Sequence, residues 1–183
     1  MSNNIKTDFN ALENNIIDVI KEEQIKLGYT RETIRLYYPI ESINHLLTEN
    51  FTIAEIQGLL DQFCEYVKPR LGEVTHSNMD TRFCFVIPSN GVTYVHEKIE
   101  DRPFLKEFIE AISKHNQTLS EILSIFHRYS DCVICNKMDN GEFDYLVYFS
   151  DELPDAYMYC LKFENCHVIY HRFTKADYDS FGF

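Results

Sequence analysis

The chain has little of what marks disordered or nucleic-acid-binding proteins. Its 183 residues include only five prolines and six glycines, too few for a disordered or linker-rich chain. Lys and Arg total 17 against 29 Asp and Glu, which gives a net charge of −12. Because binding to a phosphate backbone needs clustered cations, this charge argues against nucleic acid as a partner.

Export and membrane signals are also missing. No apolar run approaches the ~18–20 residues of a membrane span, and the first ten residues, MSNNIKTDFN, lack the apolar core of a signal peptide. The six cysteines of a chain without an export signal are expected to be free thiols. We therefore expect a cytoplasmic protein with no membrane contact.

The sequence lacks tryptophan but contains 14 Phe and 12 Tyr. Tyrosine is common at interfaces, although sheet packing is the simpler interpretation because aromatic side chains favour strands. The phosphate-binding loops G-x-x-x-x-G-K-[ST] and G-x-G-x-x-G are absent, as are G-x-S-x-G and H-E-x-x-H. We expect no cofactor.

The pattern of the first 70 residues predicts helices. Apolar residues over 9–27 recur mostly at helical spacing, and Gly28 suits the position after a helix. Thr30 can cap a short helix that Pro39 ends. Thr52 and Glu55 form a capping-box pattern that opens a helix over 53–67.

The period then changes from helix to strand. Residues 82–87 and 92–99 flank Asn90-Gly91, and Asn-Gly between two such runs is the strongest short hairpin signal. Two helices follow, one beginning at Pro103 and one at a second capping box, Thr118 with Glu121.

The last third predicts a four-stranded antiparallel meander. Residues 132–138 and 143–149 flank Asn140-Gly141, and residues 156–163 and 166–173 flank Glu164-Asn165. The fold class is therefore α+β: an N-terminal helical part with a β-hairpin, two helices, and a C-terminal antiparallel β-meander. We expect one compact unit over 1–183; if the chain divides, the parts are 1–99 and 100–183.

In element order, residues 30–99 resemble a winged-helix domain, with 53–67 as the recognition helix and the hairpin at Asn90-Gly91 as the wing. The resemblance implies DNA binding. However, Glu55, Asp61 and Glu65 lie on that helix, and carboxylates there would repel a phosphate backbone. A protein-contacting or structural role is then the expectation. The segment 28–39, GYTRETIRLYYP, is similar to part of a bacterial family of unknown function, which implies no activity.

Cys132 and Cys135 form a C-x-x-C pair, a spacing used by zinc and redox sites. Both lie in a predicted strand, where an offset of three residues puts the side chains on opposite faces. Core packing is therefore favoured over a metal or redox role.

Cys160, His167 and His171 are candidates for nucleophilic catalysis, because an imidazole beside a thiol can activate it. With a Glu164-Asn165 turn, Cys160 is opposite Ile169, and both histidines lie diagonally from it on the same face. The alternative is a mixed sheet face without chemistry.

Arg35, Tyr37, Tyr38 and His45 could line a small pocket for an anion, since guanidinium forks and phenol hydroxyls suit carboxylates and phosphates. Helical spacing favours the alternative that one tyrosine packs inward and Arg35 pairs with a glutamate.

Taken together, these patterns favour a non-enzymatic protein-interaction module that binds another protein or itself. One alternative is a small-ligand binder or enzyme with a cleft between the helical part and the meander. The other is a divergent winged-helix DNA binder.

Overall fold

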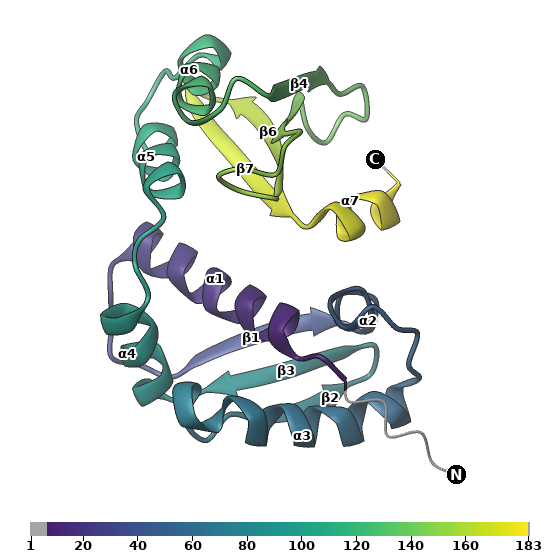
Figure 1. Cartoon of the computed structure of the whole chain (residues 1–183). Coiled ribbons are helices and arrows are strands. Elements are labelled where there is room, and N and C mark those ends of the chain that lie inside the picture. Colours follow the sequence, from purple (N-terminus) through teal and green to yellow (C-terminus); the bar gives the residue numbers. More distant parts are fainter. Residues whose placement is uncertain (1–6, 183) are drawn as a thin grey trace. The chain divides into compact units, whose positions relative to one another are not determined.

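A computed structural model describes residues 7–182 of the chain. Contacts between Cα atoms divide the protein into two compact units, Met1–Glu100 (unit 1) and Asp101–Phe183 (unit 2), and each is described by itself. Both units combine helices with an antiparallel sheet (Figure 1), so the predicted α+β class is confirmed. That the whole chain acts as one unit stays a prediction.

Unit 1 contains four helices and a three-stranded sheet of order β1-β3-β2 within the described residues. In chain order its elements are α1 (Asn10–Leu27), β1 (Ile34–Pro39), α2 (Ile40–Leu47), α3 (Ile53–Leu71), β2 (Thr75–Met79), β3 (Arg82–Ile87) and α4 (Ser89–Lys98).

Helix α3 begins at the predicted capping box. The Glu55 N–H donates to Thr52 Oγ1 at 3.4 Å, and the Thr52 N–H donates to Glu55 Oε2 at 2.9 Å, which satisfies two amides that have no partner inside the helix. The helix continues past Pro69 and ends before Gly72, whose φ of 76° suits glycine.

The expected short helix before Pro39 is wrong, because this segment is strand β1. Ile34, Leu36 and Tyr38 alternate with exposed Arg35 and Tyr37, which is the period of a half-buried strand. The strand pairs antiparallel with β3, Ile34 opposite Ile87.

The predicted hairpin at Asn90-Gly91 is also wrong, because residues 89–98 form helix α4. Val92 and Val95 are buried at helical spacing, and Pro88, which has no N–H to donate, stands just before the first turn. The partners of β3 are β1 and β2. Strand β2 escaped prediction because its sequence, THSNM, is polar and mostly exposed.

One core holds unit 1 together. Phe63 of α3 packs edge-to-face against Phe85 of β3 and against Phe9 at the start of α1, with ring centroids 5.8 and 5.6 Å apart. All three rings are buried. This core positions the outer surfaces of α1, α3 and β1.

Unit 2 places a four-stranded meander, β4-β5-β6-β7, between helices. Its elements are α5 (Pro103–Ile112), α6 (Leu119–Tyr129), β4 (Val133–Lys137), β5 (Tyr145–Phe149), β6 (Met158–Glu164), β7 (His167–Phe173) and α7 (Lys175–Phe181). The predicted meander and the capping box that opens α6 are confirmed.

The two faces of this sheet have separate apolar clusters. On one face, Phe104 and Phe108 of α5 and Phe126 of α6 pack against Tyr159 of β6. On the other face, Tyr178 of α7 packs on a cluster formed by Phe143, Leu146, Met158 and Cys160. Helix α7 therefore covers a surface that the meander alone would leave open.

Two predicted registers are wrong. A two-residue turn at Asn140-Gly141 predicts Lys137 opposite Asp144, whereas Lys137 pairs with Tyr145. In the last hairpin the turn is Asn165-Cys166 instead of Glu164-Asn165, because Glu164 pairs with His167. Both turn residues have positive φ, 49° and 67°, as a two-residue turn between twisted strands requires.

Candidate functional site

The C-x-x-C cysteines lie at an edge of the unit 2 sheet. Cys132 precedes β4 and Cys135 lies within it, and both are exposed free thiols, whereas core packing was expected. Partial burial raises the pKa of Cys135, which disfavours the thiolate that metals and disulfide exchange need. Across residues 7–182, no group of three or more His, Cys, Asp or Glu side chains is placed to hold a metal ion.

Cys160 and His171 lie directly opposite each other on β6 and β7, because the register differs from the predicted one. Cys160 is fully buried, and burial raises the pKa of its thiol to about 11. The His171 ring packs against Phe143 and Phe173, with centroids 5.4 and 6.0 Å away. A neutral, inaccessible thiol is a poor nucleophile.

His167 instead contacts a histidine that the sequence reasoning did not single out. Its ring lies 4.5 Å from that of His115, in the α5–α6 connection. The Asn116 N–H donates to the carbonyl of Cys166 at 2.8 Å and ties this connection to the β6–β7 turn. The two histidines are about 50 positions apart in the chain, so no local pattern could have paired them.

The structure separates the four residues of the proposed anion pocket. Tyr38 is buried and donates its hydroxyl hydrogen to Asn15 Oδ1 at 2.7 Å, whereas Arg35 and Tyr37 are exposed on the other side of β1. His45 lies on α2. Of the four residues, Arg35 lines a recess in unit 1.

This recess, here called the α1–β1 pocket, has a volume of about 300 Å³. It lies where the last two turns of α1 meet the segment 28–33 and the start of β1. Val19, Ile34, Leu36 and Val92 form its apolar wall.

Polar side chains complete the α1–β1 pocket. Glu23, Glu32 and Arg35 are exposed at its rim, and Gln24 lines it further in. The Gln24 Nε2 donates to the carbonyl of Val92 at 3.1 Å, while its Oε1 is buried without a hydrogen-bond partner. Such an apolar pocket with a few directed polar groups is typical of small-molecule sites.

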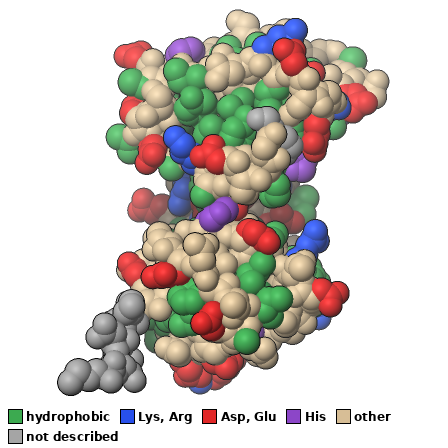
Figure 2. All heavy atoms as spheres, turned by 90° about the vertical axis from the view of Figure 1, so that its right-hand side faces the viewer, with side chains coloured by type: hydrophobic (Ala, Val, Ile, Leu, Met, Phe, Trp, Pro, Cys, Tyr) green, Lys and Arg blue, Asp and Glu red, His purple; other side chains and the backbone are tan. Residues whose placement is uncertain are grey.

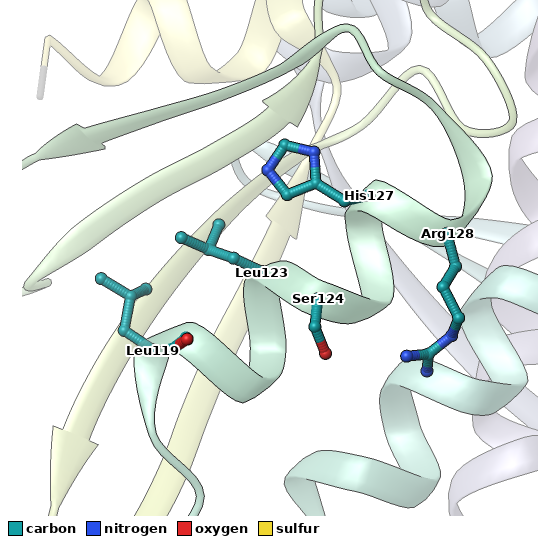
Figure 3. A pocket seen from close by; sticks show the side chains of 6 residues that line it. Leu119, Leu123, Ser124, His127 and Arg128 are labelled. Atoms are coloured by element: carbon teal, nitrogen blue, oxygen red, sulfur yellow. The ribbon is translucent and has the colours of Figure 1, made fainter.

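A second recess lies on unit 2 and is lined by helix α6 alone (Figure 3). Figure 3 shows Leu123 and His127 on one side of the helix and Arg128 directed away from them. Arg128 forms an ion pair with Glu107 of α5. Because one helix supplies every lining residue, this recess is a shallow helix face rather than an enclosed site.

The sequence analysis also gave no sign of a buried charge pair in unit 2, between Arg172 and Asp155. Arg172 Nη1 lies 3.4 Å from Asp155 Oδ2, and the two side chains are only 2% and 1% exposed. The Tyr159 hydroxyl donates to Asp155 at 2.9 Å, and burial, followed by the Asp155 charge, raises the pKa of Tyr159 well above its ordinary value. The site is closed, which fits a structural role.

Negative charge dominates the outer side of α3. Glu55, Asp61 and Glu65 are exposed there. Lys68 forms ion pairs with Glu65 and with Glu73. Figure 2 shows the same imbalance on one face of the molecule, where acidic side chains are scattered and the few basic ones form no continuous patch. Helices in the described part of the chain include none that is long and apolar enough to span a membrane.

The fold and the sites define an α+β protein of two compact units. Over residues 9–182 the chain matches the model of the bacterial family described as "Domain of unknown function, E. rectale Gene description (DUF3877)". The chain belongs to this family. No curated protein and no solved structure matches it.

Proposed function

We propose that the protein is a non-enzymatic interaction module, and that the outer side of α3 binds a basic segment of another protein. The observation that supports this proposal is the unbalanced negative charge of that side. Glu55, Asp61 and Glu65 are exposed, and the cation Lys68 is already paired with two carboxylates. Arg70 is likewise held by both carboxylate oxygens of Glu13.

The element order of unit 1 supports a role for this helix in recognition. The order α1-β1-α2-α3-β2-β3 is similar to that of a winged-helix domain. In this order α3 takes the place of the recognition helix, and the turn at Asp80-Thr81 between β2 and β3 takes the place of the wing. Carboxylates on α3 repel phosphates, by ~1 kcal/mol per unit-charge pair at 4 Å in water. This charge favours a basic protein partner over nucleic acid.

The shape and composition of the α3 surface suit close contact with another chain. Ala54 and Gly58 are small and exposed on it, and Ile53 and Tyr66 expose 37% and 38% of their surface beside it. Apolar and aromatic groups supply contact area, while charge complementarity selects the partner. Two copies of this face would repel each other, which favours a different protein over self-association.

A charge-reversed variant tests the proposal. Full-length wild-type protein and the triple variant Glu55→Gln, Asp61→Lys, Glu65→Lys are used as baits in native lysate, and the retained proteins are identified by mass spectrometry; Gln at position 55 removes the charge and keeps the capping box. We expect the wild type to retain a partner that ~0.3 M salt releases. The variant should bind the purified partner at least tenfold more weakly.

The matched control reverses three exposed carboxylates of unit 2: Glu110→Lys, Glu142→Lys and Glu164→Lys. This control should retain the partner as the wild type does. Equal retention by the α3 variant would refute the proposal. A strict monomer in light scattering that retains nothing would also count against it.

The DNA-binding alternative has its own measurement. Fluorescence anisotropy with a labelled duplex should show no binding at physiological salt. Tight binding with a steep salt dependence would favour the winged-helix DNA binder instead.

We also propose a cytoplasmic location, which is supported by six cysteines that are all free.

A further inference from the structure

His115 and His167 form a contact between two segments of unit 2. Their imidazole rings have centroids 4.5 Å apart and an interplanar angle of 62°. His115 lies in the connection between α5 and α6, and His167 is the first residue of β7. Both residues are exposed, so an ion can reach the rings from solvent. The pair therefore presents two accessible nitrogen ligands.

The backbone holds the two histidines beside each other. The Asn116 N–H donates to the carbonyl of Cys166 at 2.8 Å, and these residues are the direct neighbours of His115 and His167 in the chain. Asn116 and Cys166 both have positive φ, 61° and 67°, so each segment turns sharply at this bond. Because the segments are already joined, an ion that binds between the rings has little chain left to order.

The separation of the rings matches that of two imidazoles on one metal ion. With a metal–nitrogen bond of ~2.1 Å, the ion lies ~3.2 Å from the centre of each ring. Two such bonds at a right angle place the ring centres ~4.5 Å apart, and two at the tetrahedral angle place them ~5.2 Å apart. The observed 4.5 Å fits the right angle that Ni²⁺ and Cu²⁺ adopt in square-planar and tetragonal sites.

The orientation of the rings can adjust to an ion without moving the backbone. A rotation about χ2 leaves the centre of an imidazole ring almost in place, and this torsion is soft. It therefore directs one nitrogen of each exposed ring at a common point while the centroid separation is kept.

A carboxylate adds negative charge beside the pair. Glu164 lies directly opposite His167 in the β6–β7 pairing, and it is exposed. Directly opposite residues have Cβ atoms ~4.5–5.5 Å apart on the same face of a sheet. Across residues 7–182 no three His, Cys, Asp or Glu side chains are placed to hold one ion, so water completes the coordination and Glu164 acts through its charge.

We propose that His115 and His167 bind one divalent transition-metal ion of the Ni²⁺ and Cu²⁺ class. Each ring contributes one nitrogen, the ligand type that suits these ions. The bound ion links the α5–α6 connection to the β6–β7 turn and thereby stabilises the folded state of unit 2. The pair belongs to unit 2 and the α3 surface to unit 1, so either proposal can fail alone.

Calorimetric titration of the full-length protein with NiCl₂ tests the site. The protein carries no histidine tag, and Ni²⁺ is the probe because, unlike Cu²⁺, it does not oxidise thiols. We expect one ion per chain and a higher melting temperature, because at tenfold excess over Kd a ligand raises the folding equilibrium constant ~11-fold. Excess Mg²⁺, which prefers oxygen ligands, should not displace Ni²⁺.

Single substitutions identify the two ligands. His115→Gln and His167→Gln should each weaken Ni²⁺ binding at least tenfold, because the second imidazole binds at the high effective concentration set by the first. The double variant should be little weaker than either single variant, and this non-additivity marks a shared ion. His127→Gln, at an exposed position of α6 in the same unit, is the matched control and should bind as the wild type does.

Two further variants test the neighbours of the pair. Glu164→Gln keeps the shape of the side chain and removes its charge, so it should weaken Ni²⁺ binding several-fold. Cys166→Ser removes the exposed thiol next to His167 in the chain and should leave the affinity unchanged. Every position changed in these tests is exposed, so affinities are compared between folded proteins.

Several results would overturn the proposal. Absence of binding heat at ~1 mM Ni²⁺, which half-fills a site of millimolar Kd, would reduce the histidine contact to ring packing. Wild-type affinity in either single variant, or half the number of bound ions at unchanged affinity, would show that the rings share no ion. Loss of binding in Cys166→Ser would assign the ion to the thiol. Failure of the α3 variant to lose its protein partner would leave this site unaffected.

Discussion

Gly91 is the position at which one added methyl group should disturb unit 1 most. It lies in α4, and an added Cβ would be 2.2 Å from the carbonyl oxygen of Leu71 and 2.9 Å from the carbonyl carbon. These are backbone atoms of the last residue of α3, so no side-chain rotation can relieve the contact. Because real Cβ atoms essentially never come within 3.0 Å of other atoms, Gly91→Ala forces the two helices apart by about 1 Å.

The expected loss in the free energy of unfolding is the cost of overpacking minus the gain in helix propensity. Overpacking typically costs ~1–3 kcal/mol, and more when backbone must move. Alanine in a helix regains ~0.5–1 kcal/mol relative to glycine. The net loss should be about 2 kcal/mol, which for a unit of about 100 residues corresponds to a fall in melting temperature of ~10 °C.

Gly58 provides the matched control. It is in the middle of α3 and exposed, and an added Cβ there has no atom within 4 Å. Gly58→Ala should therefore stabilise unit 1 by ~0.5–1 kcal/mol. The same Gly→Ala substitution is therefore expected to destabilise unit 1 in α4 and to stabilise it in α3.

Urea and thermal unfolding followed by far-ultraviolet circular dichroism measure both effects. The reasoning predicts a lower midpoint for Gly91→Ala and a higher one for Gly58→Ala. If Gly91→Ala matched the wild type or moved with Gly58→Ala, the close approach of α3 and α4 would be wrong.

Three further predictions concern unit 2. Cys166→Gly should stabilise it by ~1 kcal/mol, because glycine adopts the φ of 67° without strain; Cys166→Ala keeps the strain, so equal melting temperatures for the two variants would contradict this account. Asp155→Ala should cost ~3–5 kcal/mol in urea unfolding, since it removes the carboxylate that pairs with the buried Arg172 guanidinium, and a cost below ~1 kcal/mol would exclude that pairing. Hydrogen bonds from Thr118 lower the pKa of Glu121 in the folded protein below its ordinary 4.5. The capping box therefore stabilises the fold fully at pH values above 4.5, and this contribution is lost as the pH falls through the lowered pKa of the folded state. In thermal melts between about pH 6 and 3, Thr118→Ala should lower the melting temperature near pH 6 and reduce its fall on acidification, and an unchanged acid profile would count against the capping role.

The starts of α3 and α6 were predicted correctly from local capping signals. Thr52 with Glu55 and Thr118 with Glu121 each open a helix as expected, because a capping box acts within four residues and depends on no distant contact. Similarly, each strand of the meander is close to its predicted range.

Where local signals conflicted, tertiary packing decided. Asn90-Gly91 carries a hairpin signal, but Val92 and Val95 also have helical spacing, and burial against α3 selects the helix. Glycine is still required at position 91, although the reason is a close helix contact rather than a turn. Its neighbour in that contact, Leu71, is 20 residues away in sequence.

The candidate sites were less predictable than the fold. The sequence indicated Arg35, which does line the α1–β1 pocket, but Gln24 and Val92 come from other elements. Their contact spans 68 positions of the chain. Pairing between segments this far apart depends on the tertiary arrangement, which periodicity and spacing do not specify.

Because the exposed thiols all lie in one unit, thiol labelling can distinguish the unfolding of unit 1 from that of unit 2. The exposed cysteines, Cys132, Cys135 and Cys166, all belong to unit 2, whereas Cys84 of unit 1 is buried and Cys64 is half-buried with its pKa raised to about 11. A maleimide dye should therefore label native protein in unit 2 alone. Mass mapping of labelled peptides at increasing denaturant would then reveal which half opens first.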